Sequence, residues 1–482
     1  MTTSTLALFL ALAQSEPVHP DLADLAGRWQ GAMEACGVPA LAMALVEGDE
    51  VVHRVTLGRR DPAREAPVTP DTIFYIASIT KTYVAFALAR LAEEGKVELD
   101  APVQRYLPRF RLASAEASER ITVRDLLCHR YGLNSGPIVL LDAYTGEITE
   151  ERYYHFLAEV EPGGVAYSNL HFTLAGRVIE AVTGQPWREH LAEHLFRPAG
   201  MTRTTGYADW MYAQDDVAIP AVIVEGKPEA IPLRKTDRTM HAAGGLGTSI
   251  DDAARWLRLQ LGRGTIDGTQ LLSTRATEAS WELLADARTG AAGPPEGFGL
   301  GWQRDLYRGH LQLGHGGGYV GASAWIGFLP ELGLGLAVLT TGGSGAQGLC
   351  ELVATDVRER LLADDEVADP LPALLQRARA VRSRDAELLA PAPAAALDLS
   401  LPPERCAGTY RNEWYGTLTL ELDGPGLRAR LGDYPLVLSS PRRDVLALES
   451  SGPLGGEVRL ELDGERVTAL LLDLPETTRF AR

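Results

Sequence analysis

The stretch from Phe74 to Arg90, FYIASITKTYVAFALAR, constrains the fold more than any other part of the chain. A short apolar run leads to Ser78, and the residues after it place Ala, Val, Phe and Leu on one face at helical spacing. A helix that begins at or just after Ser78 brings Ser78 and Lys81 within one turn, on the same face. Its free N–H groups and its positive dipole end then point towards the Ser78 hydroxyl. The sequence therefore predicts a buried helix whose first turn carries a serine beside a lysine.

This pair has a chemical interpretation. A serine hydroxyl becomes a good nucleophile when a neighbouring base takes its proton, and a desolvated amine can be that base. The alternative is a helix that Ser78 caps while Lys81 is solvated. Lysine usage argues against this alternative, because the chain has four Lys (81, 96, 227 and 235) against 42 Arg. Arginine cannot be deprotonated to serve as a base. Ser78 and Lys81 are therefore the candidate nucleophile and base.

A second group of polar residues lies near position 168. Tyr167, Ser168 and Asn169 follow a Pro-Gly-Gly turn at 162–164, and residues 170–182 then show a helical pattern. In an extended segment, the side chains of Tyr167 and Asn169 point to the same side. They are candidate functional residues, and the alternative is a capping asparagine beside a packed tyrosine.

A glycine-rich run, GHGGG at 314–318, follows a strand pattern over 311–313. Because Gly316, Gly317 and Gly318 carry no side chain, a substrate backbone could lie against a strand at this point. The alternative is a glycine-rich turn in which His315 is incidental.

A competing motif occurs in the helical pattern of residues 187–196. His190, Glu193 and His194 have the HxxEH spacing of inverted zinc peptidases, with both histidines on one helix face. A zinc site would need a third protein ligand. Apolar residues at 187, 191 and 195 form the buried stripe of this helix, so the alternative is an exposed polar face.

Composition excludes some functions. The formal net charge is −18, which disfavours non-specific binding to nucleic acid or to an anionic membrane surface. The four Cys (36, 128, 350 and 406) are widely spaced without a CxxC motif, so neither a zinc cluster nor a disulfide framework is indicated. No stretch is apolar for long enough to predict a membrane span.

The first 15 residues form an apolar N-terminal segment. Residues 6–12 are apolar, and the Ala-Leu-Ala at 11–13 is similar to a signal-peptidase site. No Lys or Arg precedes the run, although a secretory signal normally has a positive n-region. We therefore favour a cytoplasmic location, with export through a weak signal as the alternative.

The pattern of residues changes after residue 365, which predicts a domain boundary there. Residues 16–365 mix helical and strand patterns, and residues 366–402 contain a charged helical pattern and a Pro/Ala linker at 390–396. Residues 403–482 contain about eight short alternating segments with turn signals between them, which predicts a small closed antiparallel barrel.

The three motifs, in this order, resemble those of the penicillin-binding-protein-like serine hydrolases, and most closely the class C β-lactamase, D-aminopeptidase and carboxylesterase branch. The likeness covers roughly residues 20–365, including LARLAEEGKVELDAPVQRYLPRF at 88–110. The run from His315 to Gly317 is similar to the third motif, which is Lys-Thr-Gly in many relatives and His-x-Gly in the esterase and aminopeptidase branch. Residues 403–482 resemble the lipocalin-like barrels appended to some of these hydrolases.

The resemblance implies an α/β (α+β) fold of the β-lactamase/transpeptidase type. We expect a mainly antiparallel sheet flanked by helices, with N- and C-terminal helices on one face and an all-helical subdomain holding Tyr167. One departure is the sequence CHRYGL at 128–133, where relatives often carry a Thr-Ser-Gly-Leu-like loop. The resemblance therefore does not predict which residues that loop contacts.

The resemblance also implies a mechanism. Ser78 attacks an ester or amide carbonyl, and Lys81 and Tyr167 share the proton transfers, with Tyr167 favoured as the base. Asn169 hydrogen-bonds Lys81 and the substrate amide, and the backbone N–H groups of Ser78 and Gly318 form an oxyanion hole. Water then hydrolyses the acyl-enzyme. No cofactor or metal is needed.

His315 bears on the choice of substrate. An imidazole with an ordinary pKa of about 6.5 is mostly neutral at pH 7, whereas a lysine would be a permanent cation for a substrate carboxylate. We therefore expect an esterase or a D-amino-acid peptidase or amidase acting on a small molecule. The alternatives are a D-Ala-D-Ala carboxypeptidase or a weak class C-like β-lactamase and, more remotely, the zinc peptidase. A homo-oligomer is compatible with this expectation.

Overall fold

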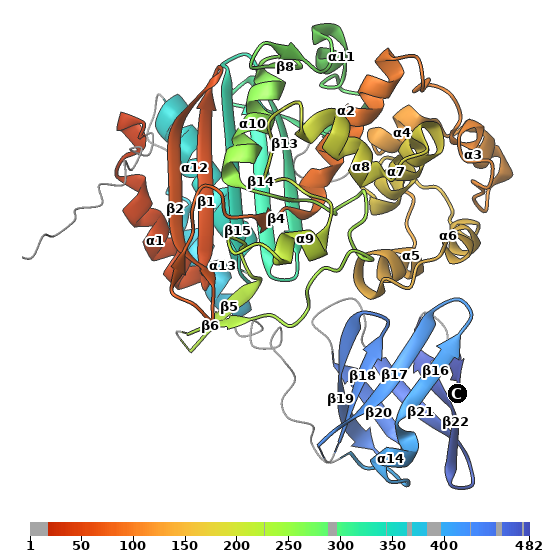
Figure 1. Ribbon diagram of the computed structural model, residues 1–482. Coiled ribbons are helices and arrows are strands. Elements are labelled where there is room, and N and C mark those ends of the chain that lie inside the picture. Colours follow the sequence, from red (N-terminus) through yellow and green to blue (C-terminus); the bar gives the residue numbers. More distant parts are fainter. Residues whose placement is uncertain are drawn as a thin grey trace, which may run out of the picture.

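Two bodies of β-structure organise the chain, a nine-stranded sheet and a closed eight-stranded barrel (Figure 1). The computed structural model describes residues 18–225, 227–287, 296–343, 345–363, 369–382, 397–424, 426–449, 456–474 and 477–482. The apolar segment 1–15 and the Pro/Ala run at 390–396 lie outside the described residues.

The nine-stranded sheet is antiparallel throughout, and its two ends come from the middle and the beginning of the chain. In spatial order its strands are β10 (Ala285–Asp286), β11 (Gly297–Phe298), β12 (Gln303–Tyr307), β13 (His310–Tyr319), β14 (Ala322–Leu329), β15 (Leu334–Thr341), β1 (Ala40–Glu47), β2 (Glu50–Asp61) and β3 (Ala66–Pro67). Strands β1 and β2 are neighbours in the chain and pair as a hairpin.

Strand β1 shows why helices cover both faces of this sheet. Its larger residues, Leu41, Met43 and Leu45, pack with α1 (Leu25–Cys36) and α12 (Ala346–Leu362), whereas its alanines pack on the side of α10 (Ile250–Leu261). A strand buried on both faces is apolar along nearly its whole length, as β1 is from Ala40 to Val46. The N- and C-terminal helices thus share one face, with α13 (Leu371–Arg382) beside them (Figure 1).

The helical part lies beyond the other face of the sheet. It includes α2 (Thr80–Glu93) and α7 (Asn169–Thr183), which pack against each other. Smaller helices complete it: α3 (Ala115–Arg120), α4 (Val123–Leu127), α5 (Gly136–Leu140), α6 (Glu150–Leu157) and α8 (Trp187–Leu191), with π-helical turns at Leu141–Thr145 and Ala192–Phe196. Helices α9 (Ala208–Tyr212) and α11 (Thr274–Ala279) are peripheral, and the short pairs are β4 (Phe74–Tyr75) with β7 (Gly247–Thr248), β5 (Ala221–Val224) with β6 (Lys227–Ala230), and β8 (Thr265–Ile266) with β9 (Thr269–Gln270).

The C-terminal barrel closes through all eight predicted strands: β16 (Gly408–Asn412), β17 (Gly416–Asp423), β18 (Gly426–Leu431), β19 (Tyr434–Arg442), β20 (Val445–Glu449), β21 (Gly456–Asp463), β22 (Arg466–Asp473) and β23 (Thr477–Ala481). A short helix, α14 (Pro403–Cys406), precedes them. Tyr410, Tyr434 and Phe480 are fully buried among inward-facing leucines. An eight-stranded barrel is just wide enough for its interior to fill with side chains, so this barrel has a packed core.

The barrel is docked end-on against the body that contains the nine-stranded sheet. The N–H of Asp433 donates to the carbonyl of Thr145 at 2.8 Å, and the Asp433 carboxylate accepts from Thr236 at 2.8 Å and pairs with Arg238 at 3.1 Å. Apolar residues 140, 222, 231 and 233 belong to the same buried cluster as the barrel interior. The two bodies therefore share part of their apolar core.

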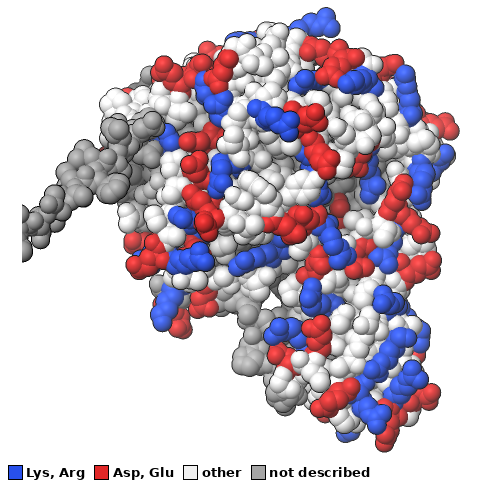
Figure 2. All heavy atoms as spheres, viewed as in Figure 1, with Lys and Arg blue, Asp and Glu red and all other residues white. Residues whose placement is uncertain are grey.

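Charges of both signs are interspersed over the face of the molecule seen in Figure 2, on both bodies. This distribution gives that face no extended basic surface of the kind that binds nucleic acid. Among the described residues, no helix is both long and apolar enough to cross a bilayer.

Candidate active site

The nucleophile turn joins β4 to α2. Ser78 lies in a 3₁₀ turn, Ala77–Ile79, and α2 follows directly at Thr80, as the spacing predicts. Ala77 has φ +44°, a left-handed conformation that costs energy for a residue other than glycine. The Thr80 hydroxyl donates to the Ala77 carbonyl at 2.7 Å and accepts from the Leu246 N–H at 3.1 Å. The surrounding bonds hold Ser78 in a strained, well-defined position at the start of the helix.

Lys81 is completely buried one turn along α2. Its Nζ donates to Ser78 Oγ at 3.1 Å, to Asn169 Oδ1 at 2.8 Å and to the carbonyl of Ala243 at 2.5 Å. Burial lowers the pKa of the amine well below its ordinary value, because a charged ammonium loses its hydration there. The alternative in which Lys81 is solvated is therefore wrong.

Tyr167 and Asn169 lie at the start of α7. Ser168 caps this helix by accepting from the Leu170 N–H at 3.1 Å, and Asn169 is its first residue. Lys81 Nζ lies 4.8 Å from the centre of the Tyr167 ring. Loss of hydration raises the pKa of the Tyr167 phenol to about 12, and a hydrogen bond with Ser78 opposes that rise. The expected convergence of Ser78, Lys81, Tyr167 and Asn169 is therefore present.

The glycine-rich run is part of strand β13 and not a turn. It pairs with β14 from Gly314↔Gly327 to Gly318↔Ser323. A Cβ on Gly317 would stand 2.1 Å from the Ile76 carbonyl oxygen and 3.4 Å from the Ser78 nitrogen. Only glycine allows this approach, so the strand passes directly against the nucleophile turn. A Cβ on Gly316 or Gly318 would meet nothing within 4 Å, which leaves open space along the strand.

His315 is buried beside Tyr167, with 5.9 Å between the ring centres. Its Nδ1 contacts the Gly316 carbonyl at 2.7 Å. Burial lowers the pKa of the imidazole to about 3, with Lys81 adding to the effect. His315 is therefore neutral at pH 7 as expected, but the expected titration near pH 6.5 is wrong.

Three more histidines surround Lys81, and sequence reasoning did not single them out. His129 Nδ1 lies 2.7 Å from His171 Nδ1, and the His129 ring centre is 4.7 Å from that of Tyr167. His241 comes from the loop before β7. The pKa of each is lowered, mainly by burial and partly by the charge of Lys81. Only His129 carried a signal in the sequence, because it lies in the segment that departs from the family pattern.

Among the described residues, the competing zinc motif has no third ligand. His190 is buried, and its ring centre is 4.5 Å from that of His194. Within the described part of the chain, no group of three or more His, Cys, Asp or Glu side chains could hold a metal ion. The hypothesis of a zinc peptidase therefore gains no support here.

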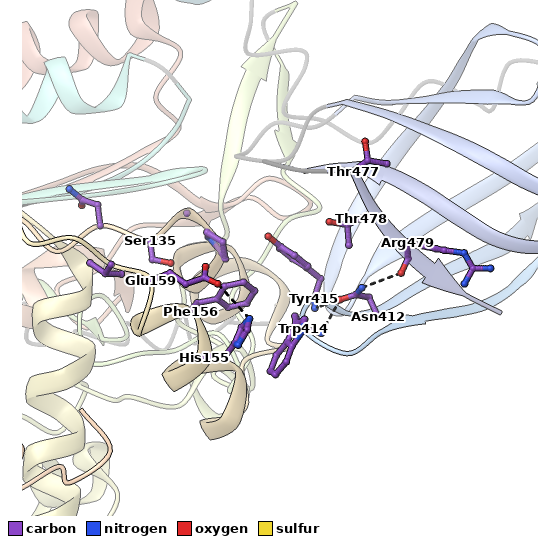
Figure 3. A pocket seen from close by; sticks show the side chains of 14 residues that line it. Ser135, His155, Phe156, Glu159, Asn412, Trp414, Tyr415, Thr477, Thr478 and Arg479 are labelled. Atoms are coloured by element: carbon purple, nitrogen blue, oxygen red, sulfur yellow. Dashed lines mark hydrogen bonds and ion pairs between the residues drawn. The ribbon is translucent and has the colours of Figure 1, made fainter. Parts of the chain in front are cut away.

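A separate cleft of about 610 Å³ lies between α6 and the barrel (Figure 3). His155 stacks on Trp414 with 3.6 Å between ring centres, and Phe156 packs against Tyr415 at 5.3 Å. Asn134 reaches the same cleft from the segment whose Leu133 carbonyl accepts the Ser168 hydroxyl. The loop between β16 and β17 thus forms one wall of this cleft. Another part of its wall, Asn134, follows the residue that contacts Ser168.

Two solved structures share the fold. An octameric penicillin-binding protein homologue from Pyrococcus abyssi superposes with a TM-score of 0.61 at 24% identity, covering 95% of this chain and 99% of that one. A D-stereospecific amidohydrolase from Streptomyces sp. has a TM-score of 0.54 at 24% identity, covering 70% of this chain and 99% of that one. The first match extends over the barrel as well as the sheet.

Curated relatives match about two thirds of the chain. Penicillin-binding protein 4 of Amycolatopsis lactamdurans is 29% identical over 317 residues, which is 64% of this chain and 81% of that protein. Unguisins hydrolase ungD' of Aspergillus campestris is 27% identical over 342 residues, 67% of this chain but only 61% of the fungal protein.

The family model named Beta-lactamase matches residues 25–356, which is more than half of the chain and includes all three motifs. Together with the sheet, the helical subdomain and the hydrolase relatives, this match identifies the chemistry as that of a serine hydrolase. The chain belongs to the beta-lactamase family.

Proposed function

We propose that Ser78 is the nucleophile of a hydrolase that cleaves esters or amides of D-amino-acid type through an acyl-enzyme. The observation that carries this proposal is the buried Lys81 amine, 3.1 Å from Ser78 Oγ, with a pKa lowered by burial. A neutral amine at this distance can accept the serine proton, and an ammonium cannot.

Lys81 is better suited than Tyr167 to be the base. The lysine pKa is depressed, whereas the tyrosine pKa is raised to about 12, so the phenol keeps its proton at neutral pH. The resemblance favours Tyr167 as the base, and the electrostatics reverse that preference. In our proposal Lys81 accepts the proton of Ser78, and Tyr167, hydrogen-bonded to Ser78, then gives its own proton to the leaving group while it takes one from the protonated Lys81 beside it.

The oxyanion would be bound by the backbone N–H groups of Ser78 and Gly318. Support comes from the approach of β13 at Gly317, which brings the two segments together, and from the open space at Gly318. One such donor is typically worth about 3–4 kcal/mol of transition-state stabilisation. Asn169 holds Lys81 through its Oδ1, which leaves its amide N–H₂ for a substrate carbonyl.

The neutral His315 favours substrates without a carboxylate at the third motif. This agrees with the likeness to a D-stereospecific amidohydrolase and to a hydrolase named for unguisins. The second candidate is a D-Ala-D-Ala carboxypeptidase or a weak β-lactamase, which the likeness to a penicillin-binding protein favours. Such activity needs a cation for the substrate carboxylate, and His315 is not one at pH 7.

The test is intact mass after incubation with a fluorophosphonate and, separately, with penicillin. We expect one fluorophosphonate adduct per chain, absent from Ser78→Ala and insensitive to chelator. Esters and D-aminoacyl amides should be turned over, with slow reaction or none with penicillin. Labelling that persists in Ser78→Ala would overturn the assignment of the nucleophile, and rapid penicillin turnover would favour the second candidate.

The oligomeric state of the chain is a further part of the proposal. The homologue from Pyrococcus abyssi is octameric, and we propose a homo-oligomer for this chain too. Light scattering of the full chain would give its mass directly, and a monomer at micromolar concentration would contradict the proposal.

A further inference from the structure

His241 lies beside the nucleophile turn and has no role in the chemistry described so far. A Cβ built on Gly244 would stand 3.4 Å from His241 Cε1, 3.7 Å from His241 Nε2 and 3.6 Å from the carbonyl carbon of Ala77. The Cε1–Nε2 edge of the imidazole and the backbone of Ala77, the residue that precedes Ser78, therefore both lie beside Gly244. The absence of a side chain at Gly244 makes room for this ring.

The loop that carries His241 is fixed at several points. Lys81 binds the Ala243 carbonyl at 2.5 Å, and Tyr75 donates to the carbonyl of Gly244. Lys235 donates to the Thr239 carbonyl at 3.2 Å. These bonds hold the backbone on both sides of His241, so the position of the ring is set in advance of any substrate.

The ring nitrogens of His241 are not used within the protein. Nδ1 is buried with no hydrogen-bond partner among the described residues, and no described residue bonds Nε2. The side chain as a whole is half-buried. A buried N–H without a partner is costlier than a buried lone pair, so the proton belongs on Nε2. Burial is the main cause that lowers the pKa of the ring, with Lys235 and Lys81 nearby, and this keeps the ring neutral.

The two sides of Ser78 differ in what they offer a substrate. Lys81 and Tyr167 supply the proton transfers and so belong on the side of the leaving group. His241 lies near Ala77, the residue before Ser78, and the acyl part of a substrate is the part that stays bonded to Ser78 after the leaving group departs.

We propose that His241 is a substrate-binding residue whose Nε2–H donates a hydrogen bond to an acceptor oxygen in the acyl part of the substrate, as in an N-acyl amino acid. This inference rests on the proposed function, because it requires an acyl group on Ser78. It narrows the substrate class to acyl groups that carry a carbonyl beyond the scissile bond.

The test compares two p-nitrophenyl esters with the same leaving group, those of N-acetyl-D-alanine and of 2-methylpentanoic acid. The second is similar in shape and lacks the amide. We expect His241→Ala to lower kcat/KM for the N-acetyl ester by about five- to tenfold, the effect of one lost hydrogen bond. The alkyl ester should change less than about twofold. His241→Gln, which keeps an N–H donor, should recover part of the loss.

The control is His310→Ala, which removes a histidine at the end of β13 away from Ser78. It should leave kcat/KM for both esters unchanged. Equal losses for both esters in His241→Ala, or no loss for either, would overturn the inference. If the wild type hydrolyses neither ester, the proposed function fails, and His241 is then tested without turnover. Nitrogen NMR of the wild-type ring should show an Nε2–H that shifts with added N-acetyl-D-alanine and stays unchanged with 2-methylpentanoate. A protonated Nδ1, or no shift, would overturn the inference by that route, including when a variant fails to fold.

Discussion

Lys81 and Lys235 are both buried, yet they differ in what their amines contact. Both have lowered pKa values, mainly because burial removes the hydration of the ammonium, and the pKa of Lys235 falls to about 7. Lys81 contacts a hydroxyl and a side-chain amide oxygen, those of Ser78 and Asn169.

Lys235 meets two backbone carbonyls and an aromatic face. Its Nζ donates to Ala143 at 2.6 Å and to Thr239 at 3.2 Å, and lies 4.1 Å from the centre of the Tyr319 ring. None of these partners can be deprotonated by an amine near neutral pH. Burial alone therefore lowers the pKa of both lysines, and only the adjacent serine turns one of the two into a candidate base.

The largest expected effect separates the two lysines by substitution. Lys81→Arg should abolish turnover, a loss of about 10²- to 10⁴-fold, because arginine keeps the charge but cannot accept the proton of Ser78. Lys235→Met, the matched control, should keep at least about a tenth of the wild-type kcat. Steady-state kinetics on one ester measures both. A Lys81→Arg variant with more than about a tenth of the wild-type rate would lose only ~1.4 kcal/mol and would contradict the base role.

A lysine introduced at position 315 extends the comparison of Lys81 and Lys235 to a third lysine in the active site. His315→Lys should raise the ratio of kcat/KM for acidic over neutral acyl substrates by about tenfold or more, because a cation about 4 Å from a carboxylate is worth on the order of 1–4 kcal/mol. In the wild type the ratio should stay flat from pH 8 to pH 5, because the pKa of His315 is about 3. An unchanged ratio in the variant would mean that position 315 does not face a substrate carboxylate.

The pH dependence of stability tests whether burial acts on both amines. Lys235 has a pKa of about 7 when folded and an ordinary value of 10.5, so unfolding takes up a proton between these pH values. Its contribution therefore makes the free energy of unfolding rise with pH in this window, by about 1.4 kcal/mol per pH unit. The wild type should gain stability relative to Lys235→Met at that rate from pH 8 to pH 9.5.

Urea unfolding of both proteins at each pH measures this difference, and the subtraction removes the titration of the four cysteines. Lys81→Met should show a slope of the same sign, because its pKa is also depressed. A constant difference between the wild type and Lys235→Met would mean that the Lys235 amine stays charged when folded.

The smallest expected effect on the reaction concerns the barrel, which supports the loop of Lys235 but not α2. We predict that residues 1–390 fold alone, with reduced stability, because removal of the barrel exposes Ile231 and Leu233 and leaves Thr236 without Asp433. Rates on small esters should change by less than about threefold, whereas bulky substrates should react faster without Trp414 and Tyr415 at the cleft. Light scattering would show whether assembly is lost. Unchanged size, rate and selectivity would leave the barrel without a role in either.

Much of the local structure was predictable. Helix α10 (Ile250–Leu261) is an example, because its apolar residues repeat at helical spacing behind a capping Ser249. The eight barrel strands are also as expected, since alternation and turn residues repeat through the tail. The β13 glycines were open between strand and turn, because glycine favours neither, and pairing with β14 decided for the strand.

By itself the sequence determined that Ser78 and Lys81 share a helix turn, because that relation depends only on helical geometry over three residues. It also determined the barrel, whose pattern is local to each strand. Only the tertiary structure decided which buried lysine meets a hydroxyl, which histidines gather around it, and that the Tyr167 phenol keeps its proton. Hydration and contact depend on atoms from segments far apart in the chain, so no local pattern of residues records them.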